Sequence, residues 1–256
     1  DVTGLVATAF THRDSRAGDP DLHTHVAVAN KVQTLNGKWL SVDGRILFKA
    51  NVTASESYNT SLEKHLRTRL GLVFAEREGT DRGKRPVREV VGVDPRLNAR
   101  WSTRRVAIEA RRGVLAAAFQ ADHGRPPTVV ESIQLAQQAT LETREAKHEP
   151  RTLAEQRQAW ADQAEEVLGG AQGVTNMVTA ALSAGRTAEA VATGSVTVDS
   201  AWVRTTSVRV RDEVQAHRAT WQVWHLRAEA HRQVRAANLP SDQVETVVDL
   251  VTHEAA

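Results

Sequence analysis

The sequence predicts an α+β protein in which an antiparallel β-sheet with flanking helices precedes a helical appendage. Two observations carry this prediction. The first third of the chain alternates apolar and polar residues with period two, and the remainder repeats apolar residues at helical spacing. No stretch approaches the ~20 apolar residues of a membrane span, and the absence of cysteine excludes disulfides, Fe–S clusters and zinc–thiolate sites. The only methionine is Met177, so we expect a piece of a longer protein.

Two strands joined by a compact polar loop are expected near the start of the chain. Alternation over residues 4–12 places His12 on one face of the first strand. Alternation over residues 23–32 places His23 and His25 together on one face of the second. The Gly-Asp-Pro-Asp sequence between them is typical of a turn, so the two strands are predicted to form a β-hairpin.

The later elements follow from turn residues and periodicity. Asn36-Gly37 predicts a second hairpin turn, and Asp43-Gly44 a third break. Helices are expected over residues 53–71, 95–122, 128–147, 152–168 and 200–237, with strands over 72–76 and 87–93 and a short helix at the end. In the first helix, Tyr58 and Leu62 lie on the side expected to be buried. Ala, Thr, Val, Gly and Ser dominate residues 170–198, which predicts a mobile connector.

Three histidines are the strongest chemical signal in the sequence. His23 and His25 share a strand face because side chains alternate with period two, which puts their Cβ atoms roughly 6–7 Å apart. Hairpin pairing brings His12 beside them. Three neutral imidazoles with positions left for water or substrate are typical of a catalytic metal site rather than a closed structural one. The alternative is two surface histidines with a coincidental neighbour.

The identity of the metal stays open at this point. Three nitrogen ligands favour Zn, Mn, Co or Ni over Mg by affinity, whereas availability and substrate phosphates favour Mg. We therefore expect a divalent metal ion, either Mg, Mn or Zn.

Basic residues concentrate in the middle of the chain. Residues 77–112 carry 11 basic and 5 acidic residues, a net charge of +6, whereas the whole chain carries +2. Arginine pairs bidentately with phosphate and stacks on bases, so an anionic partner is indicated, although a solvated helix surface explains the same block. The residues expected to bind DNA are Arg16, Asn30, Lys31, Lys84, Arg85, Arg88, Arg104 and Arg105. For Arg16, the alternative is a loop-shaping salt bridge to Asp14 or Asp19.

A known family carries a motif that resembles the histidine region. Conjugative relaxases of the TrwC/TraI type, the MobF class of HUH endonucleases, have a three-histidine motif similar to FTHRDSRAGDPDLHTHVAVANKVQ. His12, His23 and His25 match its spacing, a step of eleven and then a step of two. The segments NGKWLSVDGR, SYNTSLEKHLRTRLGLVF and VVGVDPRLNARWSTRRVAIEA resemble the family's next segments in order, so the resemblance covers roughly residues 1–168. A weaker resemblance, in RATWQVWHLRAEAHRQVRAA, is to the entry of the helicase module that often follows.

The resemblance implies a palm-like HUH fold and a mechanism. These enzymes nick one strand of single-stranded or hairpin DNA at a plasmid transfer origin, and a tyrosine keeps the 5′ phosphate as a phosphotyrosine while the histidines hold a divalent ion. It also implies relaxosome and type IV secretion coupling proteins as partners, no membrane insertion and a bacterial cytoplasmic location. The chain then divides into a relaxase domain (1–168), a connector (169–198) and the helical start of a helicase region (199–256).

The nucleophile is where this sequence departs from the family. The family's tyrosine lies upstream of the histidines, whereas only eleven residues precede His12 here, and the one tyrosine is Tyr58. We expect Tyr58 to be a core or supporting residue. The nucleophile and the acidic residue that orients a histidine are expected upstream of residue 1, and this chain alone is expected not to nick. Within the chain, Asp14 and Asp19 are the candidates for a supporting contact to a histidine.

Two other functions fit the same residues. One is a zinc hydrolase or lyase that uses the three histidines around a metal-bound water. The other is a catalytically inactive DNA-binding module in which the histidines no longer serve a metal.

Overall fold

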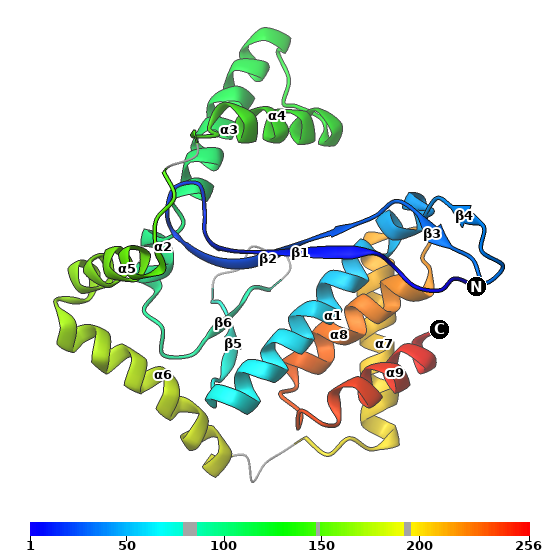
Figure 1. The fold of residues 1–256 in the computed structure, drawn as a ribbon. Coiled ribbons are helices and arrows are strands. Elements are labelled where there is room, and N and C mark those ends of the chain that lie inside the picture. Colours follow the sequence, from blue (N-terminus) through cyan, green and yellow to red (C-terminus); the bar gives the residue numbers. More distant parts are fainter. Residues whose placement is uncertain (79–85, 147–148, 192–195) are drawn as a thin grey trace. The chain divides into compact units, whose positions relative to one another are not determined.

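The computed structural model describes residues 1–78, 86–146, 149–191 and 196–256. Its strands are β1 (Ala7–Asp14), β2 (Pro20–Val28), β3 (Val32–Gln33), β4 (Trp39–Leu40), β5 (Phe74–Glu76) and β6 (Arg88–Val90). Its helices are α1 (Gly44–Leu70), α2 (Pro95–Arg100), α3 (Thr103–His123), α4 (Val129–Glu142), α5 (Leu153–Leu168), α6 (Ala171–Val191), α7 (Ser200–His217), α8 (Val223–Ala236) and α9 (Val244–Ala255). The α+β class is confirmed (Figure 1), and the described strands pair two by two in antiparallel fashion.

The chain forms two compact units, each built from two segments. The hairpin unit contains Asp1–Ser41 and Asp94–Thr175, and the bundle unit contains Val42–Val93 and Asn176–Ala256. The predicted boundaries at 168/169 and 198/199 remain predictions. The segment expected as a connector is largely helical, because α6 spans 21 residues of it. In the described part of the chain, no helix is long and apolar enough to cross a membrane.

The hairpin unit is organised around the ribbon of β1 and β2. Their register pairs His12 with His23 and Phe10 with His25, so these four side chains share one face of the ribbon, as the alternation predicted. The loop between the strands closes through a hydrogen bond from Ser15 N to Asp19 O of 2.9 Å. The predicted hairpin at Asn36-Gly37 also forms, with β3 paired to β4.

The tip of this ribbon is tied to the helices of the same unit. The buried carboxylate of Asp19 accepts hydrogen bonds from Thr103 N (3.1 Å) and Thr103 Oγ1 (3.0 Å), at the start of α3. The indole of Trp160, on α5, donates to Gly18 O at 2.9 Å. The predicted helix over 95–122 is two helices, α2 and α3, and Asp19 accepts hydrogen bonds from the first residue of the second one.

The core of the bundle unit lies between α7, α8 and α9. Its buried side chains are Val210, Val214, Leu226, Ala230, Val234, Leu239, Val244, Val247, Val248, Val251 and Ala255. The predicted single helix over 200–237 is again two, α7 and α8. The chain turns at Arg218, which has extended backbone angles, and Gln222 N donates to His225 Nδ1 at the start of α8. Neither glycine nor proline marks this break, so the sequence pattern did not reveal it.

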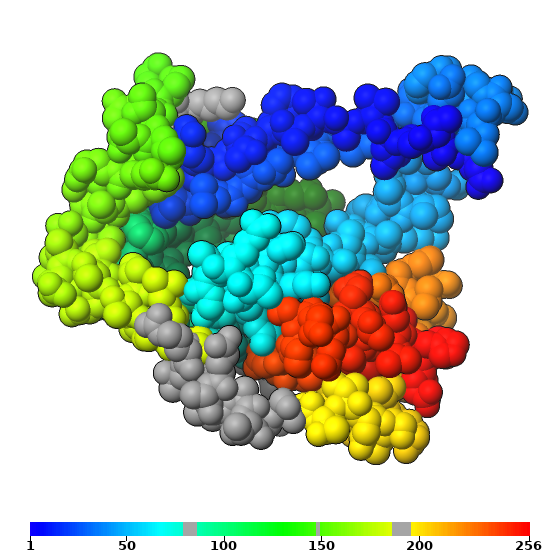
Figure 2. All heavy atoms as spheres, turned by 60° about the horizontal axis from the view of Figure 1, so that its bottom comes forward, coloured from blue at the N-terminus to red at the C-terminus, as the bar shows by residue number. Residues whose placement is uncertain are grey.

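Helix α1 begins nine residues before its predicted start, because Asp43 is its N-cap and accepts from Arg45 N at 3.0 Å. Its buried residues are Glu56, Thr60 and Glu63. These face α8, which lies directly beside α1 (Figure 2). The prediction that Tyr58 is a core residue is wrong: its side chain is 63% exposed, and the buried face is the polar one.

Candidate metal centre and its surroundings

The three predicted histidines converge on one face of the β1–β2 ribbon. Their ring centroids are 5.2 Å apart for His12 and His23, 4.8 Å for His12 and His25, and 4.9 Å for His23 and His25. One ring nitrogen from each lies within 4.8 Å of the others, and His23 Nε2 is 3.2 Å from His25 Nε2. In the part of the chain that the structure describes, this is the one cluster with metal-ligand spacing.

The orientation of His23 is set by the residue two positions before it. His23 Nδ1 lies 2.7 Å from the backbone oxygen of Asp21, which can only accept, so Nδ1 carries the proton and Nε2 keeps its lone pair. The Asp21 carboxylate lies 3.5 Å from the same nitrogen. Sequence reasoning missed Asp21, although its i−2 position on the same strand face was the available signal.

The two acidic residues considered as supporting candidates make other contacts. Asp19 caps α3 through Thr103. The Asp14 carboxylate accepts from Arg151 Nη2 at 3.2 Å and Gln156 Nε2 at 2.8 Å, which ties the end of β1 to α5. Asp19, which is buried, is a structural residue of the hairpin tip.

The donor set fits a divalent metal ion. Three imidazoles on adjacent strands point their nitrogens at a common volume, and the face they share is half-buried or exposed. Such a set leaves coordination positions for a substrate oxygen or water, which is the pattern of catalytic rather than structural centres.

A hollow of about 620 Å³ opens in front of the histidines, within the hairpin unit. Residues of the β1–β2 loop and of α3, α4 and the chain just after α4 form the rest of its wall. The lining residues are His12, Asp14, Ser15, Arg16, Asp21, His23, His25, Arg104, Thr140, Leu141 and Arg144. Its three arginines outnumber the two carboxylates, Asp14 and Asp21, so the wall carries a small net positive charge beside the imidazoles.

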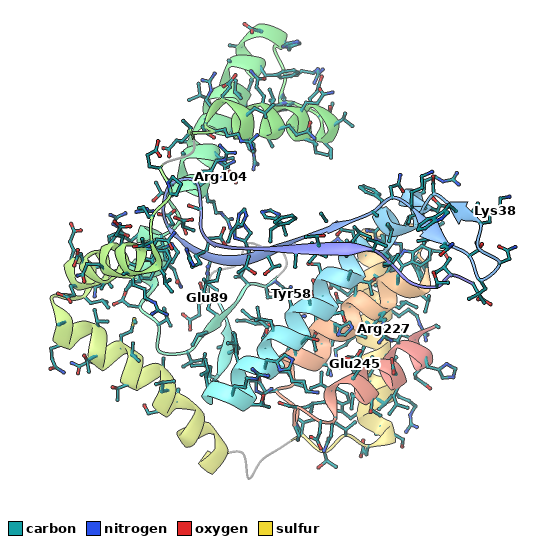
Figure 3. The ribbon with its side chains drawn as sticks, in the orientation of Figure 1. Lys38, Tyr58, Glu89, Arg104, Arg227 and Glu245 are labelled. Atoms are coloured by element: carbon teal, nitrogen blue, oxygen red, sulfur yellow. The ribbon has the colours of Figure 1, made fainter. Side chains whose placement is uncertain are left out.

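Two of the predicted DNA-binding residues line this hollow. Arg104 is half-buried on the first turn of α3, at the base of that helix (Figure 3). Arg16 donates from Nη1 to the backbone oxygen of Glu145 at 3.1 Å, which is a bond to the segment after α4 and not the salt bridge to Asp14 or Asp19 that was the alternative to DNA binding. Arg105, Asn30 and Lys31 are exposed but are not among the lining residues.

Three predicted DNA-binding residues remain. Lys84 and Arg85 lie outside the described residues. Arg88 was predicted on the DNA surface, and that prediction is wrong, because its side chain is only 9% exposed. Its guanidinium donates to both Glu63 oxygens at 3.0 and 3.1 Å, and also to Asn238 Oδ1. Arg88 therefore holds β6 to α1 inside the bundle unit.

Arg144 is a residue of the hollow that sequence reasoning missed. It follows the end of α4 by two positions and is exposed. Nothing in its local sequence distinguishes it from other surface arginines, because its approach to the histidines depends on how α4 returns toward the hairpin.

Comparison with known proteins supplies the family. The model of the TrwC relaxase family matches residues 1–167. The multifunctional conjugation protein TraI of Escherichia coli is 34% identical over 149 residues, which are 56% of this chain and 7% of TraI.

Solved structures of TrwC are also similar. TrwC complexed with a 27-mer DNA comprising the recognition hairpin and the cleavage site is 27% identical, with a TM-score of 0.47, over 64% of this chain and 52% of that one. Metal-bound TrwC in complex with oriT DNA is 25% identical, with a TM-score of 0.49, over 64% and 51%. This chain thus spans about half the length of the structures it matches.

The matched segment contains both strands of the ribbon, all three histidines, and helices α1 to α4. It covers well over half of the chain, and it agrees with the resemblance carried by the histidine motif. The chain belongs to the TrwC relaxase family.

Proposed function

We propose that this chain holds the metal site of a relaxase that nicks and transfers one strand of single-stranded plasmid transfer-origin DNA. The observation that carries the proposal is the convergence of His12, His23 and His25 on paired strands, in a chain of the TrwC relaxase family. The positive wall of the hollow in front of them suits a phosphodiester.

Each element of the site has a chemical task in this proposal. The three histidines hold a divalent ion, either Mg, Mn or Zn, and the Asp21 backbone oxygen keeps the His23 tautomer that offers Nε2. When bound, the ion neutralises and polarises the scissile phosphate. The arginines of the hollow hold the strand so that this phosphate faces the histidines.

The nucleophile in the proposal is a tyrosine supplied from upstream of these residues. Its oxygen bonds to phosphorus, the bond to the 3′ oxygen breaks, and a free 3′ hydroxyl and a 5′ phosphotyrosine result. Tyr58 is not among the residues that line the hollow. Hairpin DNA at a transfer origin, relaxosome proteins and type IV secretion coupling proteins are the partners this function implies, in the bacterial cytoplasm.

Metal binding and nicking test the proposal together. Titration with Mn or Zn should show one site per chain, and His23→Ala should weaken binding at least about tenfold, whereas the exposed His253→Gln should not. A hairpin oligonucleotide should remain uncut by the 256-residue chain and become a covalent protein–DNA adduct once the native upstream segment is restored.

Two outcomes would contradict this account. Cleavage by the chain alone that is abolished by Tyr58→Phe would overturn the assignment of the nucleophile. Zinc-dependent hydrolysis of small esters with no DNA affinity would favour a zinc hydrolase or lyase, and DNA binding that ignores both chelator and His23→Ala would favour an inactive DNA-binding module.

A further inference from the structure

Two arginines in the hollow form no ion pair or side-chain hydrogen bond with any residue that the structure describes. These are Arg104, on the first turn of α3, and Arg144, just after α4. Three other arginines of this helix pair are engaged with carboxylates: Arg111 pairs with Glu142, Arg112 with Glu109 and Arg125 with Glu131. Arg105 of α3 has no such partner among the described residues, but it does not line the hollow. Both arginines therefore present their donors to the same space as the three histidines.

The backbone beside each of the two arginines is anchored by the tip of the histidine hairpin. Asp19 accepts from Thr103, the residue before Arg104, at 3.1 and 3.0 Å. Arg16 donates to the backbone oxygen of Glu145, the residue after Arg144, at 3.1 Å. The loop that joins β1 to β2 therefore holds the start of α3 and the segment after α4, and with them both arginines, beside His12 and His23.

The rest of the wall suits the same kind of ligand. Leu141, on the last turn of α4, is 67% exposed and lines the hollow next to Thr140. An exposed leucine and a threonine methyl offer an apolar surface beside the cationic groups. A nucleotide matches such a wall, because its anionic phosphate binds cationic groups and its sugar and base pack against apolar ones.

We infer that Arg104 and Arg144 bind a backbone phosphate next to the scissile one, and that Leu141 packs against the nucleoside attached to it. This inference rests on the proposed function and adds which phosphate Arg104 and Arg144 bind and which side chain packs against its nucleoside. A guanidinium matches the geometry of phosphate with two parallel N–H donors, so a pair of them fixes both the position and the direction of the strand.

The test is the salt dependence of binding to a labelled single-stranded oligonucleotide, measured by fluorescence anisotropy at a fixed, saturating Mn concentration. Each phosphate contact contributes about 0.7 to the slope of log K against log salt for single strands. Arg104→Gln and Arg144→Gln should each make this negative slope less steep by about 0.7. Each should also weaken binding about tenfold. Arg112→Gln is the matched control, because Arg112 is on α3, pairs with Glu109 and is not in the hollow, so both quantities should stay unchanged.

Lysine variants separate charge from geometry. Arg104→Lys and Arg144→Lys should restore the slope but only part of the affinity, because lysine lacks the bidentate fork. If a glutamine variant fails to fold, the lysine variant at that position still tests the inference through its loss of affinity. An unchanged slope in both glutamine variants, with normal binding by the parent chain, overturns this inference alone. Absence of oligonucleotide binding by the parent chain overturns the proposed function, and the inference with it.

Discussion

His231 shows how a single side chain is confined by its hydrogen bonds. It is fully buried on α8, and its Nδ1 lies 3.0 Å from Thr60 Oγ1. The Thr60 hydroxyl donates its one proton to Glu56 O and accepts from Arg235 Nη1. Nδ1 of His231 must therefore donate, and the neutral ring fits this site. A second proton would lie on Nε2, which is buried and has no partner among the described residues.

This confinement predicts a loss of stability in mild acid. Burial lowers the pKa of His231 from its ordinary value of 6.5, so the unfolded chain takes up a proton before the folded one does as pH falls. The stabilising contribution is complete above pH 6.5 and is lost progressively below it. We expect the urea midpoint of the bundle unit to fall between about pH 6.5 and 5.

Histidine variants provide the control for this pH dependence. In His231→Gln the fall between neutral and mildly acidic pH should become smaller, with a remainder from His225, whose pKa is also lowered by burial in the same unit. The exposed His253→Gln should retain the full fall. A midpoint that declines equally in the parent and in His231→Gln would assign the acid sensitivity to another group.

At the scale of the elements, the contact between α1 and α8 depends on charge rather than on apolar packing. Glu56 of α1 is buried and pairs with Arg232 at 2.8 Å and with Arg235. Burial by itself would raise the pKa of Glu56, but the hydrogen bond from Arg235 and the charges of Arg232 and Arg235 outweigh it and lower that pKa. The two helices therefore attract each other through groups that are expensive to leave unpaired.

Neutralising Glu56 should separate this interface. We expect Glu56→Gln to destabilise the bundle unit by about 3–5 kcal/mol, the cost of removing one partner from a buried ion pair, measured by urea denaturation followed by circular dichroism. Glu109→Gln is the matched control, because Glu109 pairs with Arg112 on an exposed helix surface. Its effect should be within about 1 kcal/mol. A comparable loss in both variants would contradict the special role of Glu56.

Much of the local structure follows from the sequence, and the register of the histidine hairpin is the clearest case. Alternation with period two places His12, His23 and His25 on one face because strand geometry leaves no other choice. The side of α1 that is buried was not predictable in this way. Its apolar residues indicated Tyr58 and Leu62, yet burial falls on Glu56 and Glu63, because the arginines of α8 and β6 that neutralise them come from distant parts of the chain.

At the scale of the whole molecule, both units combine segments that are far apart in the sequence. The hairpin unit joins the strands of the first 41 residues to α2 through α5. The bundle unit joins α1 and the strands β5 and β6 to α7, α8 and α9, the region in which the sequence suggested a helicase module. The two units differ in what should stabilise them, since the candidate metal centre belongs to one and the buried ion pairs of Glu56 and Glu63 belong to the other.

A metal titration followed by hydrogen exchange should separate the units. At a metal concentration of about 100 times Kd, binding stabilises the element that carries the site by about 2.7 kcal/mol. We expect Mn or Zn to slow amide exchange in β1 and β2 by up to about 100-fold, and to leave α7, α8 and α9 unchanged. Equal protection of α9 would show that the metal acts on the whole chain, and no protection of β1 would argue against the centre.

The sequence by itself determined the α+β class, the histidine hairpin and the family to which it belongs, because strand alternation and motif spacing are local properties of the chain. The tertiary structure decided which arginines are available to a ligand. Arg88 and Arg104 occupy the same basic block in the sequence, yet Arg88 is enclosed by Glu63 and Asn238 whereas Arg104 lines the hollow in front of the histidines. Whether a charged side chain is paired within the protein or available to a ligand depends on the partners that folding brings to it. Those partners lie too far along the chain for any local sequence pattern to reveal them.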